Sequence, residues 1–297
     1  MINQVLQLGR PLVMGILNAT PDSFYPESLV GRDDVAERVV TMLREGADII
    51  DIGGCSTRPG ATLVEEDEEW SRLDAVLDVV RRCAPETLLS VDTFRPAVAR
   101  RSVEHYGVGI INDVGGGSPE MFDVAASLHV PYVLTMNHEA DTVPQMVQWL
   151  SSRVQEAHDR GVADIILDPG FGFAKTRQQD YEVMAHLADL CRLFPDYPIL
   201  VGVSRKSMLY QKLGCEPADA LAATVAMNTM ALEAGADILR VHDVTAAVQT
   251  ARMVQEVQSL TSNLETPSLV GRAGERPPLT SQPLTLKLCS SNLVSRI

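Results

Sequence analysis

The chain is poor in positive charge and in long apolar runs, and each shortage disfavours a class of protein or partner. Its 25 lysines and arginines are outnumbered by 39 aspartates and glutamates, which gives a formal net charge of −14. This excess disfavours DNA, RNA and anionic membranes as main partners, because all three are negatively charged. No apolar run approaches the ~20 residues of a membrane-spanning helix, and no signal peptide pattern is present. A few locally gathered cations would still suffice to bind a small anionic substrate.

Cysteine is scarce as well, and the common catalytic signatures are missing. The five cysteines show neither CxxC nor metal-site spacing, which predicts free thiols in a reducing compartment and therefore a cytoplasmic protein. The sequence contains no GxxxxGK[ST], HExxH, GxSxG or GxGxxG motif. These absences disfavour P-loop, zinc-protease, hydrolase and dinucleotide-binding sites.

What the chain does contain is eight short apolar runs, each followed by polar residues or glycines. In chain order these are Asn18, Gly53-Gly54 with Thr57-Arg58, Asp92, Asn112-Asp113, Thr135, Asp168, Ser204-Arg205-Lys206 and His242. Stretches with helical spacing separate the runs. Eight strand–helix units predict a single α/β domain, a (β/α)8 TIM barrel with its active site at the C-terminal strand ends. We expect residues 1–260 to form this barrel.

The same pattern places the later helices and the tail. We expect helices over 178–193, 217–234 and 244–260 as the sixth, seventh and eighth of the barrel. The seventh carries no charge between Asp219 and Glu233, and a helix that is apolar nearly all round is usually covered on every side. Because barrel packing covers only one side, we predict a homodimer through the seventh and eighth helices. Residues 261–297 predict a disordered or loosely attached tail.

The strand-end residues favour binding of a heterocycle and a phosphate group. Arg240 and His242 are two residues apart and share one face of a strand, where they would bind phosphate or, alternatively, pair with nearby carboxylates. Asp92 and Asp168 suit a metal, a catalytic base or the N–H groups of a planar ring, and Asn112 offers both donor and acceptor. Without clustered histidines, heterocycle recognition is favoured over a structural metal site.

In these motifs the sequence resembles the dihydropteroate synthase family, the pterin-binding TIM barrels of folate biosynthesis that sulfonamides target. The resemblance covers about residues 11 to 258. It rests on LNATPDSF at 17–24, DIGG at 51–54 with STRPG at 56–60, SVDT at 90–93, INDV at 111–114, DPGFGF at 168–173, SRKS at 204–207 and RVHDV at 240–244. Each motif alone is weak, whereas all seven in order at the predicted strand ends are highly specific.

The resemblance implies a transferase that joins p-aminobenzoate to 6-hydroxymethyl-7,8-dihydropterin diphosphate, giving 7,8-dihydropteroate and pyrophosphate. The implied pterin-binding residues are Asp92, Asn112, Asp168 and Lys206. Those implied for catalysis and pyrophosphate binding are Asn18, Thr57, Arg58, Arg240 and His242, with Mg²⁺ near Asn18. Those implied for p-aminobenzoate are Phe173, Ser207, Thr57 and Pro59. The loops after the first two strands would close over the site and exclude water.

Three departures from the family pattern keep alternatives open. Cys55 stands where the family usually has Glu, residues 25–28 replace a glycine-rich stretch, and TMNH at 135–138 replaces a Met-His-Met sequence. One alternative is a non-catalytic pterin-binding paralogue. The other is a methyltetrahydrofolate-dependent methyltransferase domain, which should lack the motifs that this chain has at 20–24 and 204–207.

Overall fold

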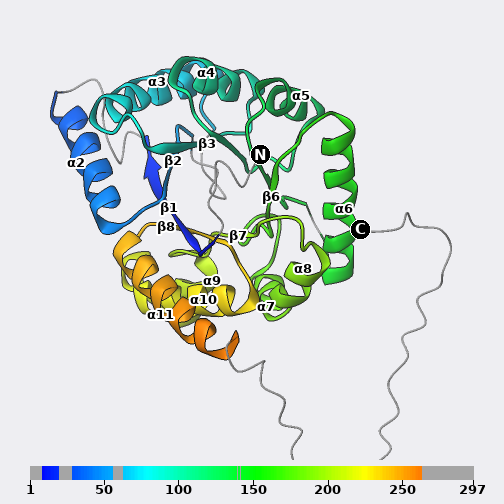
Figure 1. Cartoon of the computed structure of the whole chain (residues 1–297). Helices are drawn as coiled ribbons and strands as arrows, with labels where there is room; N and C mark the ends of the chain where they lie inside the picture. Colours follow the sequence, from blue (N-terminus) through cyan, green and yellow to red (C-terminus); the bar gives the residue numbers. More distant parts are fainter. Residues whose placement is uncertain (1–8, 20–28, 56–62, 139, 141, 263–297) are drawn as a thin grey trace, which may run out of the picture.

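A computed structural model of the chain describes residues 9–19, 29–55, 63–138, 140 and 142–262, and it contains a parallel eight-stranded barrel ringed by helices (Figure 1). The strands are β1 (Leu12–Asn18), β2 (Ile49–Gly53), β3 (Leu88–Asp92), β4 (Ile110–Asp113), β5 (Tyr132–Thr135), β6 (Ile165–Asp168), β7 (Leu200–Val201) and β8 (Ile238–Val241). Their order is β6-β5-β4-β3-β2-β1-β8-β7, and a parallel bridge between Leu167 and Ile199 links the two outer strands. The predicted TIM barrel is therefore confirmed.

The helices are α2 (Leu29–Glu45), α3 (Glu66–Cys83), α4 (Pro96–Tyr106), α5 (Pro119–Leu128), α6 (Val143–Asp159), α7 (Arg177–Ala185), α8 (Leu187–Leu193), α9 (Ser207–Leu213), α10 (Leu221–Ala234) and α11 (Val244–Ser262), with a 3₁₀ turn η1 (Pro217–Asp219). The single helix predicted over 178–193 is wrong. The chain breaks at His186, whose carbonyl accepts the amide of Asp189 in a tighter 3₁₀-type turn. The helix predicted over 217–234 likewise divides into η1 and α10. The tail predicted over 261–297 lies outside the described residues from 263 onward.

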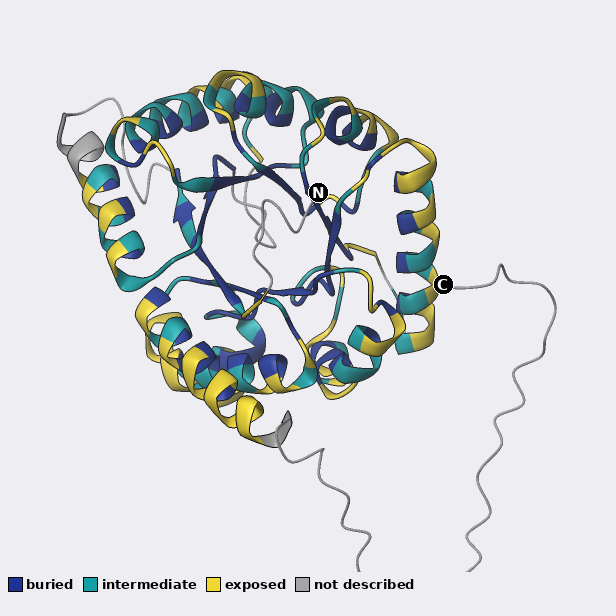
Figure 2. Cartoon of the chain, viewed as in Figure 1, coloured by how far each residue is buried: buried dark blue, intermediate teal, exposed yellow. Residues whose placement is uncertain are grey.

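Side chains of each strand alternate between the barrel interior and the helices. Those that point outward pack with the inner helix faces, which are buried while the outer faces are exposed (Figure 2). The strand register arranges the inward side chains in layers of four from alternate strands, the geometry of such barrels. From the N-terminal end upward, the layers are Ile49, Ile110, Ile166 and Ile238; Met14, Ser90, Val133 and Leu200; Asp51, Asn112, Asp168 and Arg240; and Ile16, Asp92, Thr135 and Gly202.

The barrel interior thus changes from apolar to polar along its axis. Four isoleucines fill one layer near the N-terminal end, and two layers above them every residue is polar or charged. Polar side chains in a barrel core cost stability unless they are hydrogen-bonded or paired, so a layer made only of such residues points to a function. The layer of Asp51, Asn112, Asp168 and Arg240, which we call the polar layer, therefore marks the functional end of the barrel.

Candidate active site

Arg240 of the polar layer joins strand β8 to strands β2 and β3. Its Nε donates to Asp51 Oδ2 at 2.7 Å, and its Nη2 donates to Asp92 Oδ2 at 2.5 Å. The amide of Asn112 donates to the same Asp51 oxygen at 3.1 Å. Burial alone would lower the pKa of Arg240, but the Asp51 and Asp92 carboxylates raise it, so the guanidinium stays charged. The sequence left open whether Arg240 binds phosphate or pairs with carboxylates, and the structure shows it paired with carboxylates.

Polar atoms without partners lie beside this ion pair. Among the described residues, no hydrogen-bond partner is found for Asp51 Oδ1, Ser90 Oγ, Asp92 Oδ1, Asn112 Oδ1 or Thr135 Oγ1. Buried polar atoms in folded proteins are nearly always satisfied, so such a group needs an explanation. Burial raises the pKa of Asp92 to about 7, against the opposing effect of Arg240. Among these atoms, the unpartnered oxygens of Asp92 and Asn112 are suited to bind the polar edge of a heterocycle.

Asp168 and Lys206 bring opposite charges to the same site. Burial raises the pKa of Asp168, although Lys206 opposes the change, and Asp168 Oδ1 accepts the amide of Gly170 at 2.7 Å. Burial lowers the pKa of Lys206 to about 8, although Asp168 opposes it. Lys206 Nζ donates to the carbonyl of Phe171 and lies 4.7 Å from the centre of the Phe173 ring. The four predicted pterin residues therefore gather with Arg240 at one barrel end.

A half-buried lysine that sequence reasoning missed holds the loop between β6 and α7. Lys175 Nζ donates to the carbonyls of Met136, Gly170 and Phe173 at 3.1, 3.0 and 3.2 Å. Gly170 has φ 71°, and a Cβ there would lie 2.1 Å from the Met136 carbonyl oxygen, so only glycine fits. The loop that carries Phe173 is thereby fixed to the end of β5.

His242, Asn18 and Ser207 lie around the strand ends. His242 Nδ1 and the His242 amide are each 3.1 Å from Ser204 Oγ, and the His242 carbonyl accepts Arg38 Nη2 of α2 at 2.9 Å. Asn18 ends β1 opposite Gly53 of β2. Ser207 is the first residue of α9, directly after Lys206.

The two adjacent basic residues after β7 have different surroundings. Arg205 makes a bidentate pair with Asp243 at 2.8 and 2.7 Å and donates to the carbonyls of Pro217 and Ala218. Lys206 is directed to the β6–α7 loop instead. Only Lys206 therefore belongs to the candidate site.

The remaining predicted site residues, Thr57, Arg58 and Pro59, lie outside the described residues. The described chain reaches buried Cys55, where Gly54 packs tightly because a Cβ would lie 2.8 Å from Leu73 Cγ and 2.9 Å from Glu69 O. Glu69 is fully buried and pairs with Arg95. This pair fixes the beginning of α3 beside the segment that leads into the second loop.

Two negative findings apply to the described part of the chain. It holds no group of three His, Cys, Asp or Glu residues that could bind a metal ion. It also holds no helix with the length and apolar character needed to cross a membrane.

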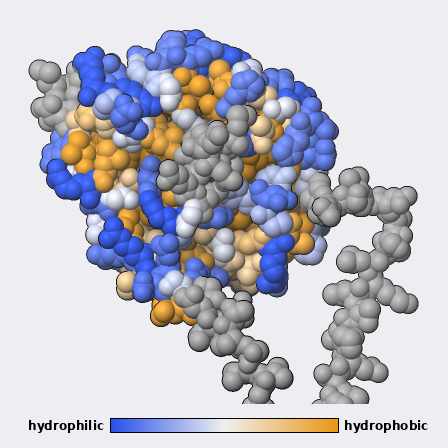
Figure 3. All heavy atoms as spheres, in the orientation of Figure 1, coloured by the Kyte–Doolittle hydropathy of each residue, from blue (hydrophilic) through white to orange (hydrophobic). Residues whose placement is uncertain are grey.

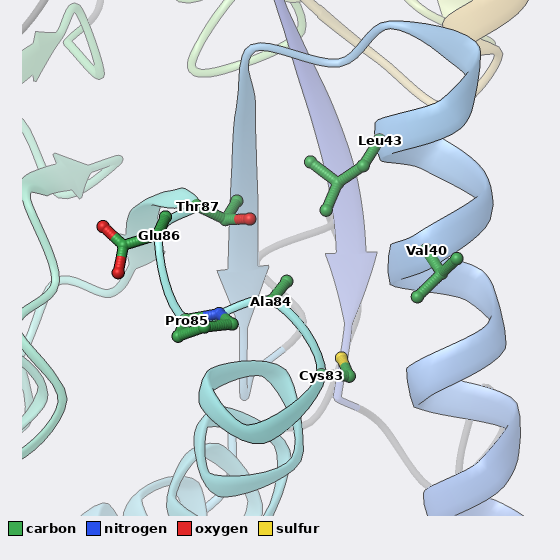
Figure 4. Close-up of a pocket in the computed structure, with 7 residues that line it drawn as sticks. All are labelled: Val40, Leu43, Cys83, Ala84, Pro85, Glu86 and Thr87. Carbon is green, nitrogen blue, oxygen red and sulfur yellow. The ribbon is translucent and has the colours of Figure 1, made fainter.

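A hollow of about 420 Å³ lies elsewhere, at the N-terminal end of the barrel. Figure 4 shows it between α2 and the turn from α3 to β3, lined by Val40, Leu43, Cys83, Ala84, Pro85, Glu86 and Thr87. Apolar residues are exposed near α2 in the space-filling view as well (Figure 3). Glu86 is the only carboxylate among the lining residues, and these residues include no lysine or arginine. This hollow lacks the chemistry of the opposite end, so we do not regard it as the active site.

Comparison with known proteins finds similar sequences and structures over most of the chain. The sequence profile of the family described as "Pterin binding enzyme" matches residues 14–242. Dihydropteroate synthase of Bacillus subtilis is 41% identical over 259 residues, covering 82% of this chain and 88% of the relative. The Escherichia coli K12 enzyme is 37% identical over 276 residues, covering 87% and 95%. The solved structure of Xanthomonas albilineans dihydropteroate synthase with 4-aminobenzoic acid is 40% identical, covers 85% of this chain and 94% of that one, and has a TM-score of 0.77.

Proposed function

Since the chain belongs to the dihydropteroate synthase family of pterin-binding enzymes, we propose that its polar barrel end condenses 6-hydroxymethyl-7,8-dihydropterin diphosphate with p-aminobenzoate, as a transferase that releases pyrophosphate. The observation that carries this proposal is the gathering of Asp92, Asn112, Asp168 and Lys206 around Arg240, with acceptor atoms left unpartnered. Such a set matches a ring that presents N–H groups and a carbonyl along one edge.

In this proposal the pterin lies over the polar layer. Asp92, Asn112 and Asp168 bind its N–H groups, while Lys206 donates to an acceptor on the ring. The Asp51 carboxylate keeps Arg240 in place within the polar layer, so Asp51 acts as a positioning residue. Because Arg240 and the strands already hold the carboxylates and the amide, these side chains need little further ordering when the ring binds.

Bond formation needs little acid–base help in this reaction. The neutral amine of p-aminobenzoate attacks the methylene carbon of the pterin, the carbon–oxygen bond to the diphosphate breaks, and the electron pair leaves with pyrophosphate. The nitrogen then releases a proton. The chain's task is to orient the amine, through Phe173 and Ser207 with Thr57 and Pro59, and to stabilise the departing charge through Asn18, Thr57, Arg58, Arg240 and His242.

Magnesium fits this arrangement as a partner of the substrate. Asn18 supplies an amide oxygen, a hard ligand that Mg²⁺ accepts, and the described residues form no dedicated metal cage. Asn18 would therefore help to hold an ion that accompanies the diphosphate of the substrate. Bound there, Mg²⁺ supplies positive charge that stabilises the leaving group.

The quaternary and cellular context is also a proposal. The outer face of α10 carries exposed Ala222, Ala226 and Met230, and α11 packs beside it, which supports a homodimer through these helices. The described cysteines Cys55, Cys83, Cys191 and Cys215 form no disulfide, which supports a reducing, cytoplasmic location. Sulfonamides, as family inhibitors, would compete with p-aminobenzoate.

A two-substrate assay tests the function. The purified chain is incubated with the pterin diphosphate, p-aminobenzoate and Mg²⁺, and both 7,8-dihydropteroate and pyrophosphate are quantified. We expect the two products in equal amounts. Pterin binding by well-folded protein without pyrophosphate release would overturn the synthase and support the non-catalytic paralogue.

A further inference from the structure

Thr135, at the end of β5, carries a hydroxyl to which the residue roles proposed above assign no partner. Its side chain is fully buried, and Oγ1 has no hydrogen-bond partner among the described residues. A valine would have the same shape without a polar atom. Because an unsatisfied buried hydroxyl destabilises the folded state, a threonine here needs a compensating role.

The register places this hydroxyl inside the candidate site. Val133, two residues earlier, belongs to the apolar cluster of the barrel interior, so Thr135 points inward as well. Thr135 pairs in register with Asp168 of β6. It shares its layer with Asp92, whose Oδ1 is also unpartnered, and that layer lies directly above the polar layer.

Ser90 provides an internal comparison. Its Oγ is equally buried and unpartnered, but Ser90 pairs with Asp51 and Ile110 and lies one layer below the polar layer. The polar layer therefore separates Ser90 from a ligand at the C-terminal end. Thr135 lies one layer above the polar layer, on the side of a ligand at the C-terminal end.

We propose that Thr135 is a specificity-determining residue of the pterin site, whose hydroxyl hydrogen-bonds a polar atom of the bound ring on the β5 side. This inference rests on the proposed function. An ionised carboxylate only accepts and an ammonium only donates, whereas a hydroxyl does either. Thr135 therefore adds a contact that adapts to a ring nitrogen with or without its proton. It also gives β5 a role in the site.

Isosteric substitution tests this role, with 6-hydroxymethylpterin as the probe. Binding is measured by calorimetry and stability by thermal unfolding for wild type, Thr135→Val, Thr135→Ser and Ser90→Ala. We expect Thr135→Val to weaken pterin binding by about 5- to 10-fold. The same variant should raise the Tm of the ligand-free protein by about 2 to 4 °C, because it removes an unsatisfied hydroxyl. Thr135→Ser should restore most of the affinity, and Ser90→Ala should leave it unchanged.

The opposite directions of the two effects separate ligand recognition from a structural role. Thr135→Val with a Kd within twofold of wild type would overturn the inference, as would a lowered Tm, which would show that the hydroxyl supports the fold. If wild type itself binds no pterin, the proposed function fails rather than the assignment of Thr135 alone.

Discussion

At the scale of single residues, the site depends on charges held in an environment that disfavours them. Burial opposes the charged forms of Asp168, Asp92 and Lys206, raising the pKa of both acids and lowering that of the lysine. Oppositely charged neighbours offset part of the free-energy cost of burying these charges. A ligand that pairs with the same groups offsets more of it, so the burial that destabilises the free protein favours binding.

Lys206 provides the sharpest test at this scale. Lys206→Met keeps the aliphatic stem but removes the charge, and we expect pterin affinity to fall about 10- to 100-fold with the fold intact. Lys212→Met, an exposed lysine on α9, is the matched control and should bind like wild type. Calorimetry gives both constants. Equal affinities for the two variants would remove Lys206 from the pterin site.

The pKa of Lys206 also predicts a pH dependence. Binding that needs the ammonium is complete below about pH 8 and weakens as pH rises above it, because the free lysine loses its proton there. Lys206→Arg keeps its charge to higher pH, so its alkaline decline should move upward. Calorimetric titrations from pH 6 to 10 compare the two proteins. A decline at the same pH in both would assign it to the ligand instead.

Several residues of the site could be predicted from the sequence, and the reasons for the misses are physical. Asp92, Asn112, Asp168 and Lys206 follow apolar strands, so local pattern alone places them at the strand ends. Lys175 acts on carbonyls from the end of β5 and from its own loop, and no local pattern shows that contact. Pairing of Arg240 with Asp51 joins residues far apart in the chain. Asp51 does lie two residues after inward Ile49, so strand period could have placed it.

At the scale of elements, the β6–α7 loop combines unusual backbone with charged clamps. Gly170, Gly172 and Ala174 all have positive φ, a backbone conformation that persists only where the surrounding structure supports it. Asp168 and Asp180 accept hydrogen bonds from amides of this loop, and Lys175 and Lys206 donate hydrogen bonds to its carbonyls. Lys206 is also proposed to bind ligand. Lys175 is therefore the lysine that holds the loop independently of the substrate.

Removing Lys175 should disturb the second substrate more than the first. In Lys175→Met the loop loses three hydrogen bonds, Phe173 is less well placed, and we expect the KM for p-aminobenzoate to rise about 10-fold. Lys175→Arg should recover part of this loss because it keeps the charge and donors. Steady-state kinetics with each substrate varied provide the measurement. An unchanged KM alongside a lowered Tm would reduce Lys175 to a stability residue.

At this scale the sequence pattern predicts the strands better than the boundaries of the helices. For seven of the eight strands, the polar residue or glycine that follows the apolar run is the last residue of the strand or the next one, because each strand is a buried run closed by such a residue; β7 ends earlier, at Val201. The break at His186 was missed, since apolar spacing continues across it and only the local 3₁₀-type hydrogen bond marks it. The short α9 was missed because its seven residues directly follow the SRK motif and hold too few turns for a periodic signal.

At the scale of the whole molecule, apolar surface and polar chemistry lie on different parts of the barrel. The polar layer is at the C-terminal strand ends, while α10 and α11 expose Met230, Met253, Val257 and Leu260 on the outer ring. Residues 253, 257 and 260 fall on one face of α11 by helical spacing. Contiguous exposed apolar side chains on adjacent helices are typical of a protein interface.

The homodimer prediction can therefore be tested without touching the site. Met230→Glu combined with Val257→Glu places two carboxylates in the proposed interface, where burial of unpaired charge opposes association. We expect sedimentation to give about twice the chain mass of 32.3 kDa for wild type and a single chain mass for the double variant. Leu63→Glu, at an exposed apolar residue before α3, should leave the dimer intact. Because surface substitutions of this kind change stability by only about 0.5 kcal/mol, a shift in mass with an unchanged Tm reports the interface. A double variant that still sediments as a dimer would move the interface away from α10 and α11.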